Sequence, residues 1–201
     1  GSGFLVTPGD YSVSVSLVKD GIVELLVDKQ AFTVKGLNNQ TLLAKNPEDL
    51  KAFRAEISEL NRKVSGTEKV MGETKESIEL IEKALLNYPN TDLTFLKSIR
   101  EMMVSLKDLE VLMWGDKAKS SREFETVPSI SGRLGMVAYQ IYQNTAGVTK
   151  THRLNKQIAE KQYNALRNEL NEIIGALNEM ESKLEGIIPY TGNKGADWKK
   201  D

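Results

Sequence analysis

The sequence predicts a mainly α-helical fold: an elongated up-and-down bundle of four helices, preceded by a small N-terminal β-ribbon. Two observations carry this prediction. Between residues 4 and 36 apolar and polar side chains alternate, which is the period of a strand buried on one face. From Pro47 onward apolar side chains recur every three or four residues, which is the period of an amphipathic helix.

The composition is that of an ordinary folded protein. The chain has 201 residues, 40% of them hydrophobic and 27% charged, enough for one good core or two small ones. Its net charge is −1 with no run of Lys or Arg, which argues against binding to nucleic acid or to an anionic membrane. It has no cysteine, which excludes disulfides, thiolate catalysis and cysteine-based metal sites. The chain has no apolar run long enough to span a membrane.

The β-ribbon, assigned to residues 1–40, begins at the turn signal Pro8-Gly9. In the stretch that follows, apolar side chains at every second position alternate with serines: Tyr11, Val13, Val15 and Leu17. Asp20-Gly21 predicts a hairpin turn into a second strand, and residues 30–35 are a candidate third strand. We expect the apolar face to be covered by the helices or by a second chain. A bare face would instead mark the ribbon as the cut end of a larger sandwich.

The helical bundle is assigned to residues 46–188, and a flexible tail to 189–201. Asn46 can cap the first helix, with Pro47 at its first position. Its apolar seam covers about five heptads: Leu50, Phe53, Ile57, Leu60, Val64, Thr67, Met71, Thr74, Ile78, Ile81 and Leu85. Because Thr67 and Thr74 are polar and two glycines lie nearby, we expect a bend or irregularity near residues 65–73.

Three more helices follow in the predicted bundle. The second is capped by Thr91 or Asp92 and stops at Trp114-Gly115, and a polar loop then reaches Ser129 or Ser131, which opens the third. The third ends at Gly147, and the turn after it leads to the fourth, which ends at Pro189. Short turns at 88–91 and 147–150 predict antiparallel neighbours.

Few residues point to catalysis. The single histidine, His152, lies at the start of the fourth helix, where an exposed or capping role explains it better than catalysis or metal binding. The glutamates fall on the polar faces of the helices, as solvated side chains do: Glu56, Glu59, Glu76, Glu79, Glu82, Glu169, Glu172 and Glu179. The sequence predicts no cofactor and no metal site.

Five aromatic residues form the candidate interaction surface: Trp114, Tyr139, Tyr142, Tyr163 and Trp198. The first four fill the core near one end of the bundle, or they line a groove for a partner, because Trp and Tyr are enriched at such surfaces. Trp198 is free in the tail or docks onto a neighbouring domain.

The order of these segments carries a resemblance. The stretch "VTPGDYSVSVSLVKDG…LLVDKQAFTVKG" resembles the end of a small Ig-like domain, and a helical region containing "SISGRLGMVAYQIYQNTAGVTKTHRLNKQ" follows it. Together they are similar to the C-terminal part of bacterial proteins with sortilin-type (BNR-repeat) β-propellers, loosely labelled glycosyl hydrolases. The resemblance implies a propeller upstream, no catalytic residue in this chain, and export to the periplasm, the cell surface or the medium.

These observations favour a non-catalytic C-terminal structural or interaction module of a larger exported bacterial protein. It would scaffold a neighbouring propeller or a protein partner. Two alternatives stay open at this point. The chain could be an accessory part of a glycoside hydrolase that adds carboxylates to a shared cleft. It could also be a self-assembly protein in which the seam of residues 50–85 pairs between chains as a coiled coil.

Overall fold

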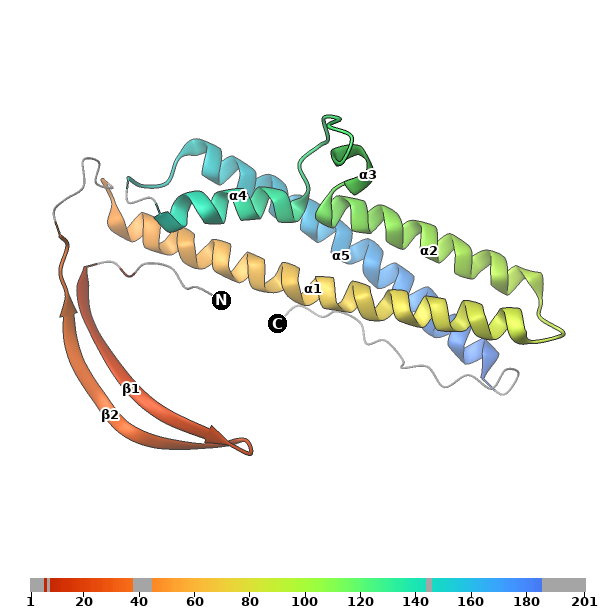
Figure 1. Ribbon diagram of the computed structural model, residues 1–201, viewed down its shortest axis with the longest axis horizontal. Helices are drawn as coiled ribbons and strands as arrows, with labels where there is room; N and C mark the ends of the chain where they lie inside the picture. Colours follow the sequence, from red (N-terminus) through yellow and green to blue (C-terminus); the bar gives the residue numbers. More distant parts are fainter. Residues whose placement is uncertain (1–5, 7, 38–44, 144–145, 186–201) are drawn as a thin grey trace. The chain divides into compact units, whose positions relative to one another are not determined.

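The computed structural model describes residues 6, 8–37, 45–143 and 146–185, and most of them are helical. Two strands and five helices follow one another in these residues (Figure 1): β1 (Gly9–Lys19), β2 (Ile22–Val34), α1 (Pro47–Asn87), α2 (Leu93–Trp114), α3 (Lys117–Ser120), α4 (Ile130–Gln143) and α5 (Lys150–Leu184). The mainly helical class with a small N-terminal sheet is therefore confirmed. The tail predicted at 189–201 lies outside the described residues.

The chain forms two compact units. One contains the residues up to Ala55 together with Tyr139–Val148, and the other contains Glu56–Ala138 and the residues from Thr149 onward. The first unit therefore holds the strands and the beginning of α1, whereas the second holds most of the helical residues.

In the first unit, β1 and β2 pair in antiparallel fashion and form a two-stranded sheet. Asp20 and Gly21 join the strands with φ angles of 51° and 78°, as a tight hairpin turn requires. This confirms the predicted turn. The candidate third strand at 30–35 is not separate, because β2 continues without a break to Val34.

The apolar seam predicted for α1 is confirmed at every position. All eleven side chains are buried, including Thr67 and Thr74, which are 0% and 6% exposed. The helix runs unbroken through residues 65–73, so the predicted irregularity is not seen. The two threonine hydroxyls are satisfied locally, since they donate to the carbonyls of Lys63 and Val70 one turn earlier, at 3.1 and 2.8 Å.

Side-chain contacts in the second unit fix the direction of α2 relative to α1. The Nζ of Lys75 lies 2.9 Å from Glu110, and the Nε of Arg100 lies 3.0 Å from Glu82. Residue numbers rise along α1 as they fall along α2, so the two helices are antiparallel. At the end of α2, the indole N–H of Trp114 donates to Glu68 on α1 at 2.8 Å.

The same reasoning places α5 and the start of α4 beside α1 in the second unit. The Ser131 hydroxyl at the start of α4 also donates to Glu68, at 3.2 Å, so α4 begins beside α1 where α2 ends. Helix α5 runs parallel to α1. Its Lys156 lies 2.8 Å from Glu56, and the hydroxyl of its Tyr163 lies 3.1 Å from that of Thr67.

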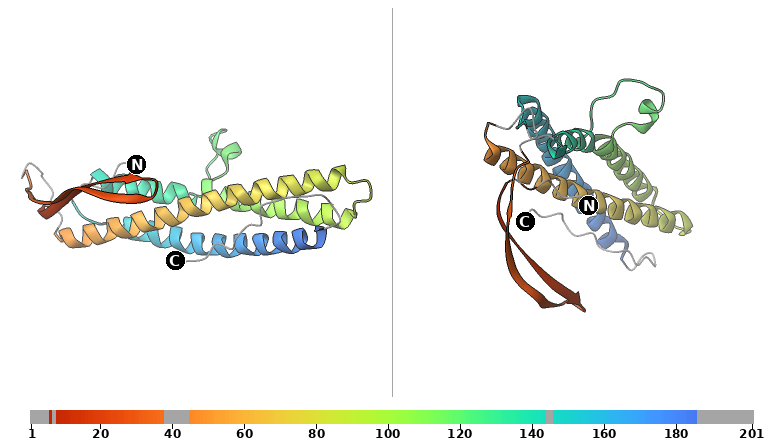
Figure 2. Two further views of the ribbon diagram at one scale, coloured as in Figure 1. Left: turned by 90° about the horizontal axis from the view of Figure 1, so that it is seen from below. Right: turned by 60° about the vertical axis from the view of Figure 1, so that its left-hand side comes forward.

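The predicted arrangement of four alternating helices is therefore corrected. Helices α2 and α4 run in one direction and occupy successive places along α1 (Figure 1 and Figure 2), so the second unit is three helices thick. Their 22 and 14 residues together nearly match the 35 residues of α5. The two shorter helices, one after the other, thus take the place of one long helix beside α1 and α5.

The helix starts follow the predicted capping chemistry. Asn46 accepts from the backbone N–H of Asp49 at 3.3 Å, Asp92 from that of Thr94 at 2.9 Å, and Ser129 from that of Gly132 at 3.1 Å. The loop predicted between the second and third helices contains one short helix, α3, and no other regular structure. Asp116 caps that helix.

Candidate functional site

One face of the hairpin is apolar over most of its length, and its polar members are Gln30, opposite Val13, and Glu24, opposite Leu17. Residues directly opposite each other in an antiparallel pair lie on the same face. The pairs Tyr11 with Phe32 and Val15 with Val27 therefore share a face, which Val13 and Leu17 also join by alternation. The rings of Tyr11 and Phe32 stack with their centroids 6.0 Å apart. The opposite face is polar near the base, where Ser12 pairs with Ala31.

This apolar face is exposed. Val13, Val15 and Leu17 are 52%, 49% and 46% exposed, and Phe32 is 49% exposed. Within the hairpin itself nothing covers the face, because a two-stranded sheet has no second layer of its own. That the helices or a second chain cover it stays a prediction.

The tip of the hairpin has apolar side chains on both faces, and the face of Leu17 also carries the charged residues Glu24 and Lys19. Val18 pairs with Val23 on the face opposite to Leu17, and both valines are more than 60% exposed, at 68% and 66%. Leu25 joins them there, opposite Ser16. The tip therefore differs from the base, where only one face is apolar.

Two irregularities bend the hairpin. The pairing register shifts between Val13 and Val15 and again between Val15 and Ser16, so that the 13 residues of β2 oppose the 11 of β1. Each extra residue bends its strand and increases the local twist. Figure 1 shows both strands curved along their length. Because the sheet has two strands, the outer edge of each is unpaired within the described residues.

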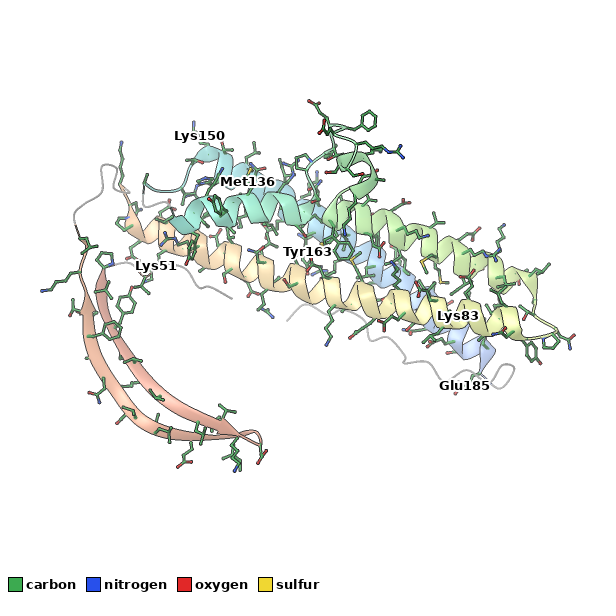
Figure 3. The ribbon with its side chains drawn as sticks, viewed as in Figure 1. Lys51, Lys83, Met136, Lys150, Tyr163 and Glu185 are labelled. Carbon is green, nitrogen blue, oxygen red and sulfur yellow. The ribbon has the colours of Figure 1, made fainter. Side chains whose placement is uncertain are left out.

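The predicted aromatic surface is only partly at the surface. Tyr163 is buried in the core of the second unit, with its hydroxyl bonded to Thr67 (Figure 3). Trp114 is 38% exposed. In the other unit, Tyr139 is exposed and Tyr142 is half-buried. Trp198 lies outside the described residues. Of the two roles predicted for these aromatics, the one in the core is thus confirmed for Tyr163.

His152 has the predicted capping role but is not exposed. The imidazole Nδ1 accepts a hydrogen bond from the backbone N–H of Thr149 at 3.2 Å, and the backbone N–H of His152 donates to the Thr149 hydroxyl at 3.1 Å. This reciprocal pair closes the start of α5. The residue is 5% exposed, and burial lowers the pKa of the imidazole below its ordinary value.

The predicted glutamates lie on helix surfaces, and several form ion pairs with neighbouring cations. Arg62 donates two hydrogen bonds to Glu59, which lower the pKa of that carboxyl to about 2. Glu56 and Glu82 pair with Lys156 and Arg100. Among the described residues, no group of three His, Asp or Glu side chains could hold a metal ion. None of the described helices is long and apolar enough to cross a membrane.

Sequence reasoning missed a buried cation. Arg54 is 5% exposed, and its Nε and Nη2 both donate to the carbonyl oxygen of Ile141, at 3.1 and 2.9 Å. That carbonyl belongs to the last turn of α4, where backbone oxygens have no partner within the helix. Arg54 follows the seam residue Phe53 directly, and no sequence signal distinguishes it from an exposed arginine.

The heptad seam proposed for pairing between chains is already used within this one. Each of its side chains is buried, with Ile57, Ile78 and Ile81 at 0% exposure. A coiled coil formed through residues 50–85 of two copies would have to expose this core again. Comparisons with models of protein families, with curated proteins and with solved structures gave no match.

Proposed function

We propose that this chain is a non-catalytic structural and interaction module of a larger exported bacterial protein, and that its hairpin docks onto an adjoining β-domain. The observation that carries the proposal is the exposed apolar face of the hairpin, which runs from Tyr11 to the tip. The resemblance to the C-terminal part of sortilin-type β-propeller proteins supports it, because there an Ig-like sheet adjoins a helical region.

The size of the face favours a partner in the same polypeptide. A two-stranded ribbon 11 residues long presents a face of on the order of 400 Å². Docking would bury about 800 Å² over both partners, whereas specific interfaces between separate proteins bury about 1,200 Å² or more. A covalent link makes the smaller area sufficient, since it raises the effective concentration of the partner to the millimolar range.

The two-sided tip sharpens the proposal. Strands that are apolar on one face cover the surface of a core, whereas strands that are apolar on both faces lie inside one. With Val18 and Val23 on one face and Leu17 on the other, the tip would contact apolar layers of the partner on both sides. The charged side chains Glu24 and Lys19, which share the face of Leu17, would lie at the rim of that contact. The polar base, with Ser12 on its outer face, would stay in contact with water. This is the position of an Ig-like strand pair that completes a sandwich.

The test uses the longest natural reading frame that contains this chain. Val15→Thr with Leu17→Thr removes apolar groups from the docking face, and Ser12→Thr with Ser14→Thr is the matched control on the polar face. We expect the first pair to lower the thermal midpoint of the long protein and the control pair to leave it unchanged. Equal effects of the two pairs, or a reading frame without an adjoining β-domain, would contradict the proposal.

A further inference from the structure

Residues 115–129 form an ordered lobe between α2 and α4. The end of α2 and the start of α4 both contact Glu68 on α1, so a short connection would suffice to join the two helices. Instead, a segment containing α3 stands out from the helices of the second unit (Figure 1 and Figure 2). The stability of the bundle does not explain this segment, whose residues 117–128 are all exposed.

The lobe has a fixed internal structure. Asp116 accepts the backbone N–H of Lys119 at 3.0 Å, and its other oxygen lies 3.3 Å from the Lys119 ammonium. The N–H of Phe124 closes the turn by donating to the carbonyl of Lys119 at 3.2 Å, after Glu123 at a φ of 60°. Compact surface loops held by their own contacts in this way are frequently functional.

Two clefts lie along the lobe. They have volumes of about 430 and about 310 Å³, and both are lined by Gly115, Asp116 and the stretch Thr126–Ser129. Volumes of this size lie at the lower end of the range of ligand-binding pockets. The larger cleft is bordered by Trp114 and by the serines of α3 and its end.

The smaller cleft combines apolar walls with one unsatisfied acceptor. Val111 and Leu112 of α2 form one wall, and Val127 and Pro128 of the lobe form the other. Gln162 of α5 also lines the cleft, and its Oε1 is buried without a hydrogen-bond partner in the described part of the chain. A buried acceptor without a donor is unfavourable, and a donor from a ligand would remove this penalty.

Beside this acceptor, a short stretch of the lobe has unpaired backbone groups. The backbone N–H and C=O groups of Glu125, Thr126 and Val127 make no hydrogen bond to any described residue. Val127 is 76% exposed at the mouth of the cleft. Unpaired backbone groups beside an apolar wall are available to pair with the backbone of an added peptide.

From these contacts we infer that the smaller cleft binds a short extended peptide with apolar side chains, one of whose backbone N–H groups donates to Gln162 Oε1. The charges disfavour an acidic peptide, because Lys119 is neutralised by Asp116 and Glu125 lines the same cleft. This site is independent of the hairpin, and the inference does not rest on the function proposed above.

The experiment pans a phage-displayed library of random seven-residue peptides against the folded chain. The reference is a variant in which residues 117–127 are replaced by a short Gly/Ser linker. Because α2 and α4 each have their own contacts with α1, this variant should keep its helix content by circular dichroism. We expect peptides with alternating apolar residues to be enriched on the natural chain alone. Failure to enrich any peptide over the reference overturns the inference.

The role of the acceptor is tested by calorimetric titration of one enriched synthetic peptide. Gln162→Leu should weaken binding about tenfold, equivalent to about 1.4 kcal/mol. The matched variant Gln157→Leu, at an exposed position of the same helix, should leave it unchanged. Methylation of the donating backbone nitrogen in the peptide should weaken binding to the natural chain to a similar extent. Equal affinity of both variants, or of the methylated and plain peptides, overturns the assignment of Gln162.

Discussion

The hydrogen bond between Thr67 and Tyr163 makes a sharp prediction about the core of the second unit. Their hydroxyl oxygens lie 3.1 Å apart, and the two residues are 0% and 2% exposed. Tyr163→Phe and Thr67→Val each remove one hydroxyl while keeping the shape of the side chain. Each should lower the free energy of unfolding by about 0.5–1.5 kcal/mol, the net contribution of a typical intramolecular hydrogen bond.

The double variant distinguishes this bond from a general packing effect. With both hydroxyls replaced by apolar groups, neither is left without its partner, so the combined loss should be about 1 kcal/mol smaller than the sum of the single losses. Urea unfolding followed by circular dichroism measures all four proteins, and Tyr139→Phe, 67% exposed, serves as the control with no change. Strict additivity of the two losses would refute the reasoning.

Three further predictions concern other parts of the chain. Arg54→Met should lower the free energy of unfolding by about 1.5–3 kcal/mol in urea titrations, because it removes a charged donor from a buried carbonyl; a smaller loss than that of an exposed arginine would contradict this. Burial lowers the pKa of His152 below its ordinary value of about 6.5, so as the pH falls through that value the unfolded chain gains a proton that the folded chain does not. Acid should therefore destabilise the natural protein more than the variant His152→Gln. Identical pH profiles of unfolding for the two proteins would count against this. Val15→Thr with Leu17→Thr should leave the thermal midpoint of this chain alone unchanged, since both side chains are about half exposed, and a drop of several degrees would show that the face supports the fold.

Local structure could be read from the sequence because it depends on near neighbours. The seam of α1, its start at Asn46 and the caps at Asp92 and Ser129 follow from side-chain spacing and short-range hydrogen bonding. The hairpin turn at Asp20-Gly21 is equally local.

The direction of the helices could not be read in the same way. A polar stretch between two amphipathic helices does not itself indicate whether the chain reverses. Here it joins α2 to α4 with no change of direction, because α4 contacts α1 at Glu68 near its start and at Arg54 near its end. Only contacts far apart in the sequence distinguish the two cases.

The candidate sites show the same limit. The apolar face of the hairpin was visible in the alternation from Tyr11 to Leu17, but its exposure depends on what packs against it. The shifts of register in β2 leave no pattern of their own in the sequence. Arg54 and Gln162 differ from exposed residues of their kinds only through tertiary packing. Packing places a carbonyl oxygen beside the Arg54 guanidinium and leaves the Gln162 Oε1 without a donor.

The central claim is that the hairpin docks onto an adjoining β-domain, and amide hydrogen exchange tests it most directly. Exchange of the residues of β1 and β2 is measured in this chain alone and in the longest natural reading frame that contains it. The account predicts that amides at the tip, around Val18 and Val23, exchange at least about tenfold more slowly in the longer protein, because docking excludes water from both faces. Equal exchange rates for the hairpin in the two proteins would contradict the account.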